Sequence, residues 1–477
     1  MKHCGYQQTN LSPATRRWSQ KAGAVLLATL ALSLTGFTNV FSRSSSASNE
    51  NLNISVHPTP VVEEMADWYD PFHLWPHAPR FTEQEQVSRL NKENILDDHL
   101  NRISSDFKVP KGLKERVSFW FDIYTKHGQF EHVIHHTLYP WVIYKVIDGR
   151  DIIATSKGPL WLRQKKIISL VVAEKRKIQK TLRRLSRKKR FKKLSPEERS
   201  LYKALAAIPG KRSSVFRTAA NNIRSQLGQK DFFEAGLRRS SKYLYLMEQE
   251  FSKNGLPLEL TRMPFVESSF NENAESKVGA SGIWQIMPLT GRAYSIVTRF
   301  IDERNSPLKA TEVAATVLKK YKRALKSWPL AVTAYNHGIG NIRKAIRAAR
   351  SEDLAVIISR YHRGEFKFAS SNFFSSFLAA LHAEKYQDAV YKNIFKEPLL
   401  NFVEVRLGQK VRAKNLLKLT GLPKDKLFLY NRDLKDALKS NAFLPRGYRL
   451  HLPPQQADVL IEKIGKAISI HRTTISG

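Results

Sequence analysis

Glu267 is the residue of this 477-residue sequence whose surroundings first suggest chemistry. It stands in the segment MPFVESSF, where the apolar side chains of Pro264, Phe265, Val266 and Phe270 flank a single carboxylate. Apolar neighbours exclude water from a carboxylate and raise its pKa from about 4.3 towards about 6. A carboxyl group that is still protonated near neutral pH can deliver a proton, so we predict that Glu267 is a general acid.

Two later motifs supply polar and aromatic groups of the kind that hold sugars. After the glycine-containing turn VGASG, the motif GIWQ offers an indole at Trp284 and an amide at Gln285. Further along, TAYNHGIG offers a phenol at Tyr335 and an amide at Asn336 close to a predicted helix end. Hydroxyl-rich ligands need donors and acceptors of these types, so the two motifs indicate a carbohydrate site.

The elements that must position these groups are predicted to be helices. One helix ends at Gly255, in the place of a C-cap, and the next opens at Pro257 and carries Glu267 in its last turn. Amphipathic helices are predicted over 307–326 and 370–390. A compact α-helical domain is therefore expected over residues 241–398.

The three motifs together resemble those of a known family. E-S-x-F, G-A-S-G-x-W-Q-I-M-P and A-Y-N-x-G-x-G, in this order, are similar to the soluble lytic transglycosylase (SLT) domain, especially in the membrane-bound lytic murein transglycosylase D group. The resemblance implies a lysozyme-like fold and an enzyme that cleaves the MurNAc-β-1,4-GlcNAc bond of peptidoglycan without water. It implies a 1,6-anhydro-MurNAc product and neither a metal nor an organic cofactor.

The same resemblance implies the roles of individual residues. Glu267 is the catalytic acid and then the base. The residues expected to bind substrate or support the site are Ser268, Trp284, Gln285, Met287, Tyr335 and Asn336. Trp284 and Gln285 would line the cleft and Tyr335 would hydrogen-bond the carboxylate. Two alternatives stay open, that Trp284 is a core aromatic and that Ser268 is only a helix cap.

A second catalytic carboxylate is not obvious in the sequence. Glycosidases usually use two, about 5 to 9.5 Å apart, but a substrate that attacks with its own 6-hydroxyl makes the second unnecessary. Glu272 and Glu275 are near in sequence, and we expect both to face solvent in the loop NENAES. The alternatives are a hydrolytic muramidase on the same fold and a catalytically silent peptidoglycan-binding protein.

The overall charge and the N-terminus indicate where the chain acts. The chain has 79 Lys and Arg against 42 Asp and Glu, a formal charge of +37, which favours an anionic partner. Its single cysteine, Cys4, excludes an intrachain disulfide. A basic flank and the apolar run 22–40 predict a signal peptide or membrane anchor within residues 1–47. We expect export to the periplasm or outer envelope of a Gram-negative-type bacterium, with peptidoglycan and no nucleic acid as partner.

Residues 48–240 are predicted to form an α+β accessory region with a basic amphipathic helix over 163–193. That helix holds 15 Lys or Arg and one acid, and Val171, Ile178, Leu182 and Leu185 mark its apolar face. Its basic face is either simply solvated or binds an anionic envelope polymer or membrane surface. A following helix should begin with a capping box from Ser195 to Glu198.

The histidines of the accessory region and the C-terminal part of the chain allow weaker interpretations. His132, His135 and His136 are interpreted as part of a half-buried aromatic surface, with a metal site as the alternative. Residues 399–455 are predicted to form a βααβ unit similar to LysM modules, although Gly408 is followed by Gln-Lys where that family usually has Asp-Thr. A helix is expected within 456–477. The predicted fold class is therefore multidomain and mainly α.

Overall fold

The computed structural model describes residues 90–362, 364, 366–391, 393–464 and 469–470. These residues form two compact units. Unit 1 contains residues 91–400 and 432–436, and unit 2 contains residues 401–431 and the described residues from 437 onward. The predicted signal or anchor, including the run 22–40, lies outside the described residues. None of the helices in the described ranges is both long and apolar enough to cross a bilayer.

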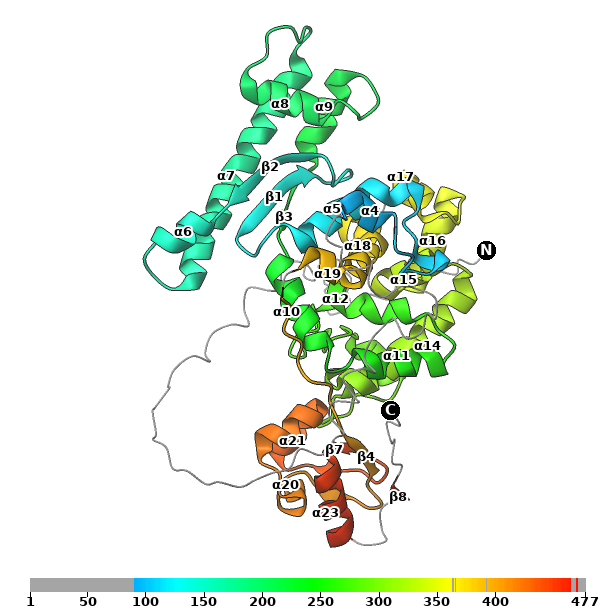
Figure 1. Cartoon of the computed structure of the whole chain (residues 1–477). Coiled ribbons are helices and arrows are strands. Elements are labelled where there is room, and N and C mark those ends of the chain that lie inside the picture. Colours follow the sequence, from blue (N-terminus) through cyan, green and yellow to red (C-terminus); the bar gives the residue numbers. More distant parts are fainter. Residues whose placement is uncertain (1–89, 363, 365, 392, 465–468, 471–477) are drawn as a thin grey trace, which may run out of the picture. The chain divides into compact units, whose positions relative to one another are not determined.

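Unit 1 begins with two α-helices and, between them, two short 3-10 helices, η3 (Ser105–Phe107) and η4 (Lys111–Leu113). An arm follows, built on a three-stranded antiparallel sheet of order β2-β1-β3 (Figure 1). Val133 of β1 pairs with Val146 of β2 on one side and with Gln226 of β3 on the other. We call residues 131–227 the arm. The elements of this part are α4 (Lys92–Leu96), α5 (Lys114–Thr125), β1 (Glu131–His136), β2 (Ile143–Asp148), α6 (Arg150–Thr155), α7 (Leu160–Arg187), α8 (Pro196–Ala204), α9 (Arg212–Asn221), β3 (Ile223–Leu227) and α10 (Lys230–Ser240).

The basic helix predicted over 163–193 is α7, and it ends at Arg187. Lys188 has extended backbone, and the chain turns before α8 begins. The four residues predicted to form the apolar face are all buried against the sheet, α8 and α9. The capping box is confirmed: Ser195 accepts a hydrogen bond from the Glu198 amide, Glu198 accepts one from the Ser195 amide, and Pro196 opens α8.

Two of the three histidines of β1, His135 and His136, are buried in the core of unit 1, and His132 is half-buried. The predicted half-buried position is therefore found for His132 and is wrong for the other two. His135 contacts the rings of Phe119 at 4.8 Å and Phe368 at 5.4 Å between centroids. Burial lowers the pKa of His135 to about 3 and that of His136 to about 4, so both are neutral at physiological pH. Within the ranges described above, no group of three or more His, Cys, Asp or Glu side chains is arranged to hold a metal ion.

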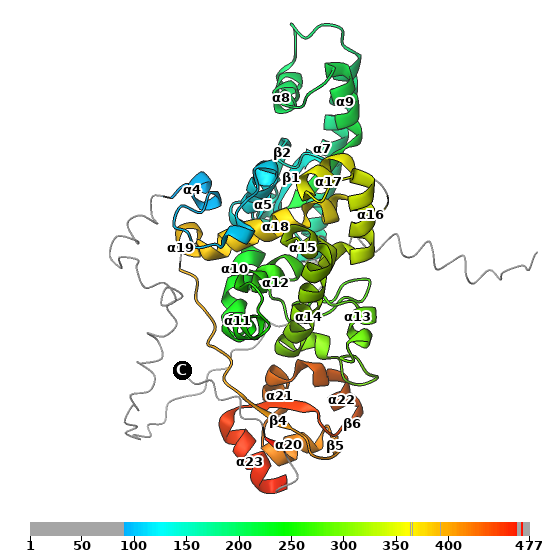
Figure 2. The ribbon, with the colours of Figure 1, turned by 90° about the vertical axis from the view of Figure 1, so that its right-hand side faces the viewer.

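The rest of unit 1 is a bundle of helices around α18. The elements are α11 (Leu244–Lys253), η5 (Leu258–Arg262), α12 (Met263–Glu267), α13 (Pro288–Ala293), η6 (Glu303–Asn305), α14 (Pro307–Leu325), α15 (Trp328–His337), α16 (Ile339–Ala349), α17 (Leu354–Arg360), α18 (Phe368–Lys385) and α19 (Gln387–Val390). α18 is buried over nearly its whole circumference because it is rich in Phe, Leu, Ala and Ser on every side. It packs against α5, α12 and α15 (Figure 1, Figure 2).

The boundary predicted at residue 240 does not separate two compact units. α5 packs along α18, and Arg116 and Trp120 of α5 both donate hydrogen bonds to the Asn372 side chain, at 2.9 and 3.0 Å. All three side chains are buried. Tyr386, just after α18, donates to Asp98 at 2.7 Å. The prediction placed these residues in a separate region because such contacts span more than 250 positions and leave no local pattern.

Unit 2 has the predicted order of strand, helix, helix and strand. β4 (Val403–Arg406) pairs antiparallel with β7 (Arg449–Leu452), and α20 (Asn415–Thr420) and α21 (Lys424–Tyr430) lie between them in sequence. The remaining elements of unit 2 are β5 (Val411–Arg412), β6 (Phe443–Leu444), α23 (Pro454–Ile464) and β8 (Ser469–Ile470). The chain returns to unit 1 at η7 (Arg432–Leu434), and α22 (Lys435–Ser440) begins in unit 1 and ends in unit 2. Of the helix expected within 456–477, the residues up to Ile464 belong to α23, but residues 469–470 form a strand beside β4, so the prediction is wrong for these two residues. The predicted fold class, mainly α with small sheets, is confirmed.

Candidate active site

Glu267 is the last residue of α12, where the chain turns sharply. Ser269 and Phe270 both have positive φ, +50° and +53°, a conformation that is unfavourable for side chains with a Cβ. Arg239 of α10 stabilises this turn by donating to the carbonyls of Ser269 at 2.7 Å and Phe270 at 3.2 Å. The buried ring of Phe270 packs edge-on against Phe265. The turn therefore ends the helix directly after the carboxylate.

A buried ion-pair network fixes the start of the helix that carries Glu267. Arg262, the last residue of η5, donates to both carboxylate oxygens of Glu384 on α18, at 3.0 and 3.2 Å. It also donates to Glu248 of α11. Separating such a buried pair is costly, because it leaves a charge in the interior without a counter-charge. The network therefore fixes the position of α12 between α11 and α18.

The carboxyl group of Glu267 is half-buried and has no polar partner among the described residues. Burial raises its pKa to about 8, well above the value predicted from the sequence. A carboxyl group with this pKa is about 90% protonated at pH 7. Because part of the side chain is accessible to solvent, the group can meet a substrate as well as hold a proton.

Two tyrosines come close enough to Glu267 to interact electrostatically with it. Tyr335 of α15 donates its hydroxyl to the Trp284 carbonyl at 3.0 Å, and not to the carboxylate as the resemblance implied. Tyr124 of α5 is buried. Burial raises the pKa of both phenols, and the nearby Glu267 charge raises it further, so both hydroxyls are neutral. Sequence reasoning missed Tyr124, because nothing in the local pattern of α5 signals a residue so distant along the chain.

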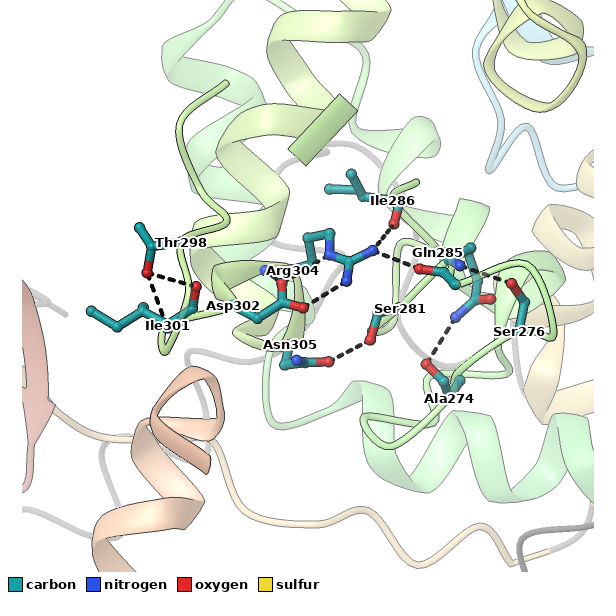
Figure 3. A network of polar contacts seen from close by, with 12 residues as sticks. Ala274, Ser276, Ser281, Gln285, Ile286, Thr298, Ile301, Asp302, Arg304 and Asn305 are labelled. Atoms are coloured by element: carbon teal, nitrogen blue, oxygen red, sulfur yellow. Dashed lines mark hydrogen bonds and ion pairs between the residues drawn. The ribbon is translucent and has the colours of Figure 1, made fainter. Parts of the chain in front are cut away.

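The loop 274–286 is held against η6 by Arg304 (Figure 3). Its guanidinium donates to the carbonyls of Gly279 at 2.6 Å and Ile286 at 3.0 Å, and it pairs with Asp302. A Cβ at Gly282 would overlap the Arg304 carbonyl oxygen, and Gly282 has φ +75°, so only glycine fits there. The close backbone approach expected of this turn is therefore present.

Ser268 and Trp284 fix the position of the loop 274–286 through hydrogen bonds and packing. The Ser268 hydroxyl donates to the Ile283 carbonyl at 2.9 Å, which ties the end of α12 to the loop. The Trp284 side chain is fully buried, stacks on Phe251, and donates its indole N–H to Thr311 of α14 at 2.8 Å. These contacts favour the alternative that Trp284 is a core aromatic. Ser268 supports the helix end through the Pro264 carbonyl, and its bond to the Ile283 carbonyl is more than the alternative of a helix cap requires.

Five of the six residues predicted to bind substrate or support the site keep some accessible surface, and Trp284 is the one that is fully buried. Gln285 is half-buried with φ +47°, and its amide donates to the carbonyls of Ala274 at 3.1 Å and Gly282 at 2.9 Å (Figure 3). Its side-chain oxygen is thereby oriented by two hydrogen bonds on the nitrogen. Met287 is exposed, and Asn336 is half-buried. Asn336 accepts a weak hydrogen bond from Ser370 at 3.4 Å.

The prediction that Glu272 faces solvent is wrong. Glu272 is buried, accepts a hydrogen bond from Tyr243 at 2.7 Å and pairs with Lys242 at 2.6 Å and with Arg432. Burial alone would raise its pKa, but the Arg432 and Lys242 charges outweigh burial and lower it. Glu275 is exposed, as expected. Glu272 is therefore a structural anion within a network of cations.

Comparison with known proteins places this site in a family. The model of the family described as "Transglycosylase SLT domain" matches residues 245–358, which include Glu267, Gln285 and Tyr335. The chain carries a transglycosylase SLT domain. The matched range runs from α11 to α17, so α5, α10 and α18, which complete the surroundings of Glu267, lie outside it.

The SLT domain has similar relatives among characterised proteins. Membrane-bound lytic murein transglycosylase D of Escherichia coli strain K12 is 35% identical over 127 residues, which are 26% of this chain and 28% of the relative. The protein of the same name in Escherichia coli strain CFT073 gives the same values. The chain thus spans little more than a quarter of the length of these relatives. The crystal structure of the 70 kDa soluble lytic transglycosylase of Escherichia coli is 17% identical, with a TM-score of 0.27 over 69% of this chain and 54% of that one.

Proposed function

We propose that this chain is a lytic murein transglycosylase, which cleaves the MurNAc-β-1,4-GlcNAc bond of peptidoglycan and leaves 1,6-anhydro-MurNAc ends. The observation that carries the proposal is the Glu267 carboxyl group, which is accessible, desolvated and protonated at neutral pH within the SLT domain. The two relatives named membrane-bound lytic murein transglycosylase D support the same reaction class.

In the proposed reaction, Glu267 acts twice. Its carboxyl proton passes to the glycosidic oxygen while the bond from that oxygen to C1 of the muramic sugar breaks. The resulting carboxylate then takes the proton of the sugar's own 6-hydroxyl, whose oxygen forms the new bond to C1. The acid is restored and no water is consumed. The attack is intramolecular, so proximity replaces a second carboxylate.

The neighbouring residues are given supporting roles. We assign direct contacts with the sugar to Gln285, Met287 and Asn336, because each has accessible surface. The hydroxyls of Ser268 and Tyr335 are instead used on the backbone carbonyls of Ile283 and Trp284. Ser268 and Trp284 instead hold the loop that presents Gln285. The neutral phenols of Tyr335 and Tyr124 keep charge away from Glu267, which is consistent with the raised pKa of its carboxyl group.

A hydrolytic muramidase is the second candidate, and it would need a carboxylate to activate water. Glu272 is engaged by Lys242 and Tyr243, and Glu275 is exposed in the same loop. Neither observation favours a water-activating role. The chemical structure of the product therefore distinguishes the two reactions. The formation of any product distinguishes both enzymes from a silent binding protein.

The test is product analysis with the full chain on purified peptidoglycan. We expect release of anhydromuropeptides, identified by mass spectrometry, and an about 100-fold to 10,000-fold lower rate for Glu267→Gln. Glu275→Gln makes the same atomic change on an exposed carboxylate of the adjacent loop and should keep about the wild-type rate. Products heavier by one water molecule would establish hydrolysis, and no release from several wall preparations would establish a silent binder.

We further propose that the chain meets this substrate in the bacterial envelope. The proposal rests on the predicted signal or anchor within residues 1–47 and on the net charge of +37. Glycan binding by the LysM-like unit is part of the same proposal, and it would appear as co-sedimentation of the Glu267→Gln protein with insoluble peptidoglycan.

A further inference from the structure

The outward side of α7 exposes large apolar side chains although the helix already has a buried apolar face. Trp161 is 60% exposed, Ile168 44% and Val172 41%. Their spacing of seven and four residues places them on one side of the helix, away from the buried stripe that contains Val171 and Leu182. A second apolar stripe on a helix that is already packed serves no purpose in the core of the arm.

The same side of α7 carries several exposed basic side chains. Lys165, Arg176 and Arg183 are exposed, and no ion pair reaches them within the described parts of the chain. Over 160–187 the helix has ten Lys and Arg against Glu174 alone. The ion pairs that α7 does make are Lys145–Glu174, Lys177–Glu197 and Arg184–Glu198.

We propose that this side of α7 is a docking surface for an anionic phospholipid membrane. Trp161, Ile168 and Val172 would enter the boundary between headgroups and acyl chains. Lys165, Arg176 and Arg183 would lie at the level of the lipid phosphates. The combination of a tryptophan, aliphatic side chains and flanking basic residues on one helix side is that of helices lying in a membrane interface.

The apolar residues distinguish a membrane from a soluble polyanion. An acidic glycan or a nucleic acid gains from Lys and Arg, but it offers no apolar interior to Ile168 and Val172. A phospholipid surface satisfies both kinds of side chain. The helix is also held in place before it binds, because its opposite face packs on the sheet and α9, so docking orders little additional chain.

The test needs a signal from α7 itself, since the apolar run 22–40 could bind lipid on its own. In the full chain, Cys4→Ser and Ser169→Cys together leave one thiol on the outward side of α7, between Lys165 and Val172. An environment-sensitive fluorophore there should shift to the blue with phosphatidylglycerol vesicles and not with phosphatidylcholine vesicles. The same label at Phe395→Cys, an 80% exposed position on a loop, should not shift.

Two variants of α7 separate the contribution of its charges to vesicle binding from the contribution of its apolar side chains. In the first variant, Gln replaces three basic residues of α7, Lys165, Arg176 and Arg183. Each lost charge should weaken vesicle binding about fivefold at low salt, so the triple variant should bind about 100-fold more weakly. The matched control replaces one Lys and two Arg on the exposed side of α16 with Gln, namely Lys344, Arg343 and Arg347. This control should leave the fluorescence titration unchanged. Trp161→Ser with Ile168→Ser should also abolish the blue shift.

Two results would overturn the proposal. One is no blue shift at residue 169 with anionic vesicles. The other is a blue shift that heparin or polyphosphate produces equally well and that Trp161→Ser with Ile168→Ser does not change, which would assign the surface to a soluble polyanion. Far-ultraviolet circular dichroism of each variant checks that α7 is intact. Because the readout is fluorescence, the outcome is independent of the proposed reaction.

Discussion

Replacing Glu267 with glutamine should stabilise the fold, and by an amount that depends on pH. The folded state raises the pKa of this carboxyl group from 4.5 to about 8, so it binds the proton more tightly than the unfolded state does. The wild-type protein is therefore fully stable below the unfolded pKa. Relative to Glu267→Gln, it loses stability as the pH rises from about 4.5 to about 8, and the difference is constant above that.

The size of the effect follows from the shift. One pKa unit corresponds to about 1.4 kcal/mol, so the whole shift corresponds to about 5 kcal/mol. Glu267 is half-buried, and water near the carboxylate screens part of its desolvation. We therefore expect Glu267→Gln to gain about 2 to 4 kcal/mol on the wild type between pH 5 and pH 9.

Calorimetric or urea-induced unfolding of both proteins at about pH 5, 7 and 9 measures this difference, and titrations common to both cancel. Glu272→Gln is a control of opposite sign, because Arg432 and Lys242 lower the pKa of Glu272 despite its burial. That variant should be less stable than the wild type at neutral pH, and the gap should close as the pH falls through the acid range. A difference for Glu267→Gln that is flat from pH 5 to 9 would refute the desolvation argument.

Three further predictions concern the same site. The rate of product release should fall about tenfold per pH unit above about pH 8, because ionised Glu267 has no proton to give; an unchanged rate at pH 9 would remove Glu267 from the acid role. Trp284→Phe should cost about 1 to 3 kcal/mol in urea unfolding, because the indole's hydrogen bond to Thr311 and part of its buried ring are lost, and the activity per folded molecule should be unchanged. A large loss of activity would show that Trp284 binds substrate. Arg304→Met should lower the free energy of unfolding by about 2 to 4 kcal/mol and weaken substrate affinity, because loop 274–286 loses its hydrogen bonds to the guanidinium. Wild-type affinity in this variant would show that the loop keeps its conformation without Arg304.

The features that the sequence predicted well depend on short-range chemistry. The capping box at Ser195, the helix that ends at Glu267 and the buried stripe of α7 each follow from residues within a few turns of one another. The family motifs likewise located the SLT domain, because they are short and lie within one matched range.

The features that the sequence did not predict depend on partners far along the chain. Glu272 is buried because Lys242 and Arg432 neutralise it, and Tyr124 reaches Glu267 because α5 packs on α18. The hydroxyl of Tyr335 bonds a backbone carbonyl, which no side-chain pattern specifies. Such contacts follow from tertiary packing, which determines burial and charge pairing after local structure has formed.

The packing of α5 on α18 has a practical consequence for protein engineering. Asn372 of α18 accepts hydrogen bonds from Arg116 and Trp120 of α5. The apolar surface of α18 is covered by α5. A chain trimmed to residues 241–398 would expose that surface to water, so it should aggregate when expressed alone. Residues 241–398 are therefore not a separable domain, and a chimera or crystallisation fragment should begin before α4 so that it includes α5.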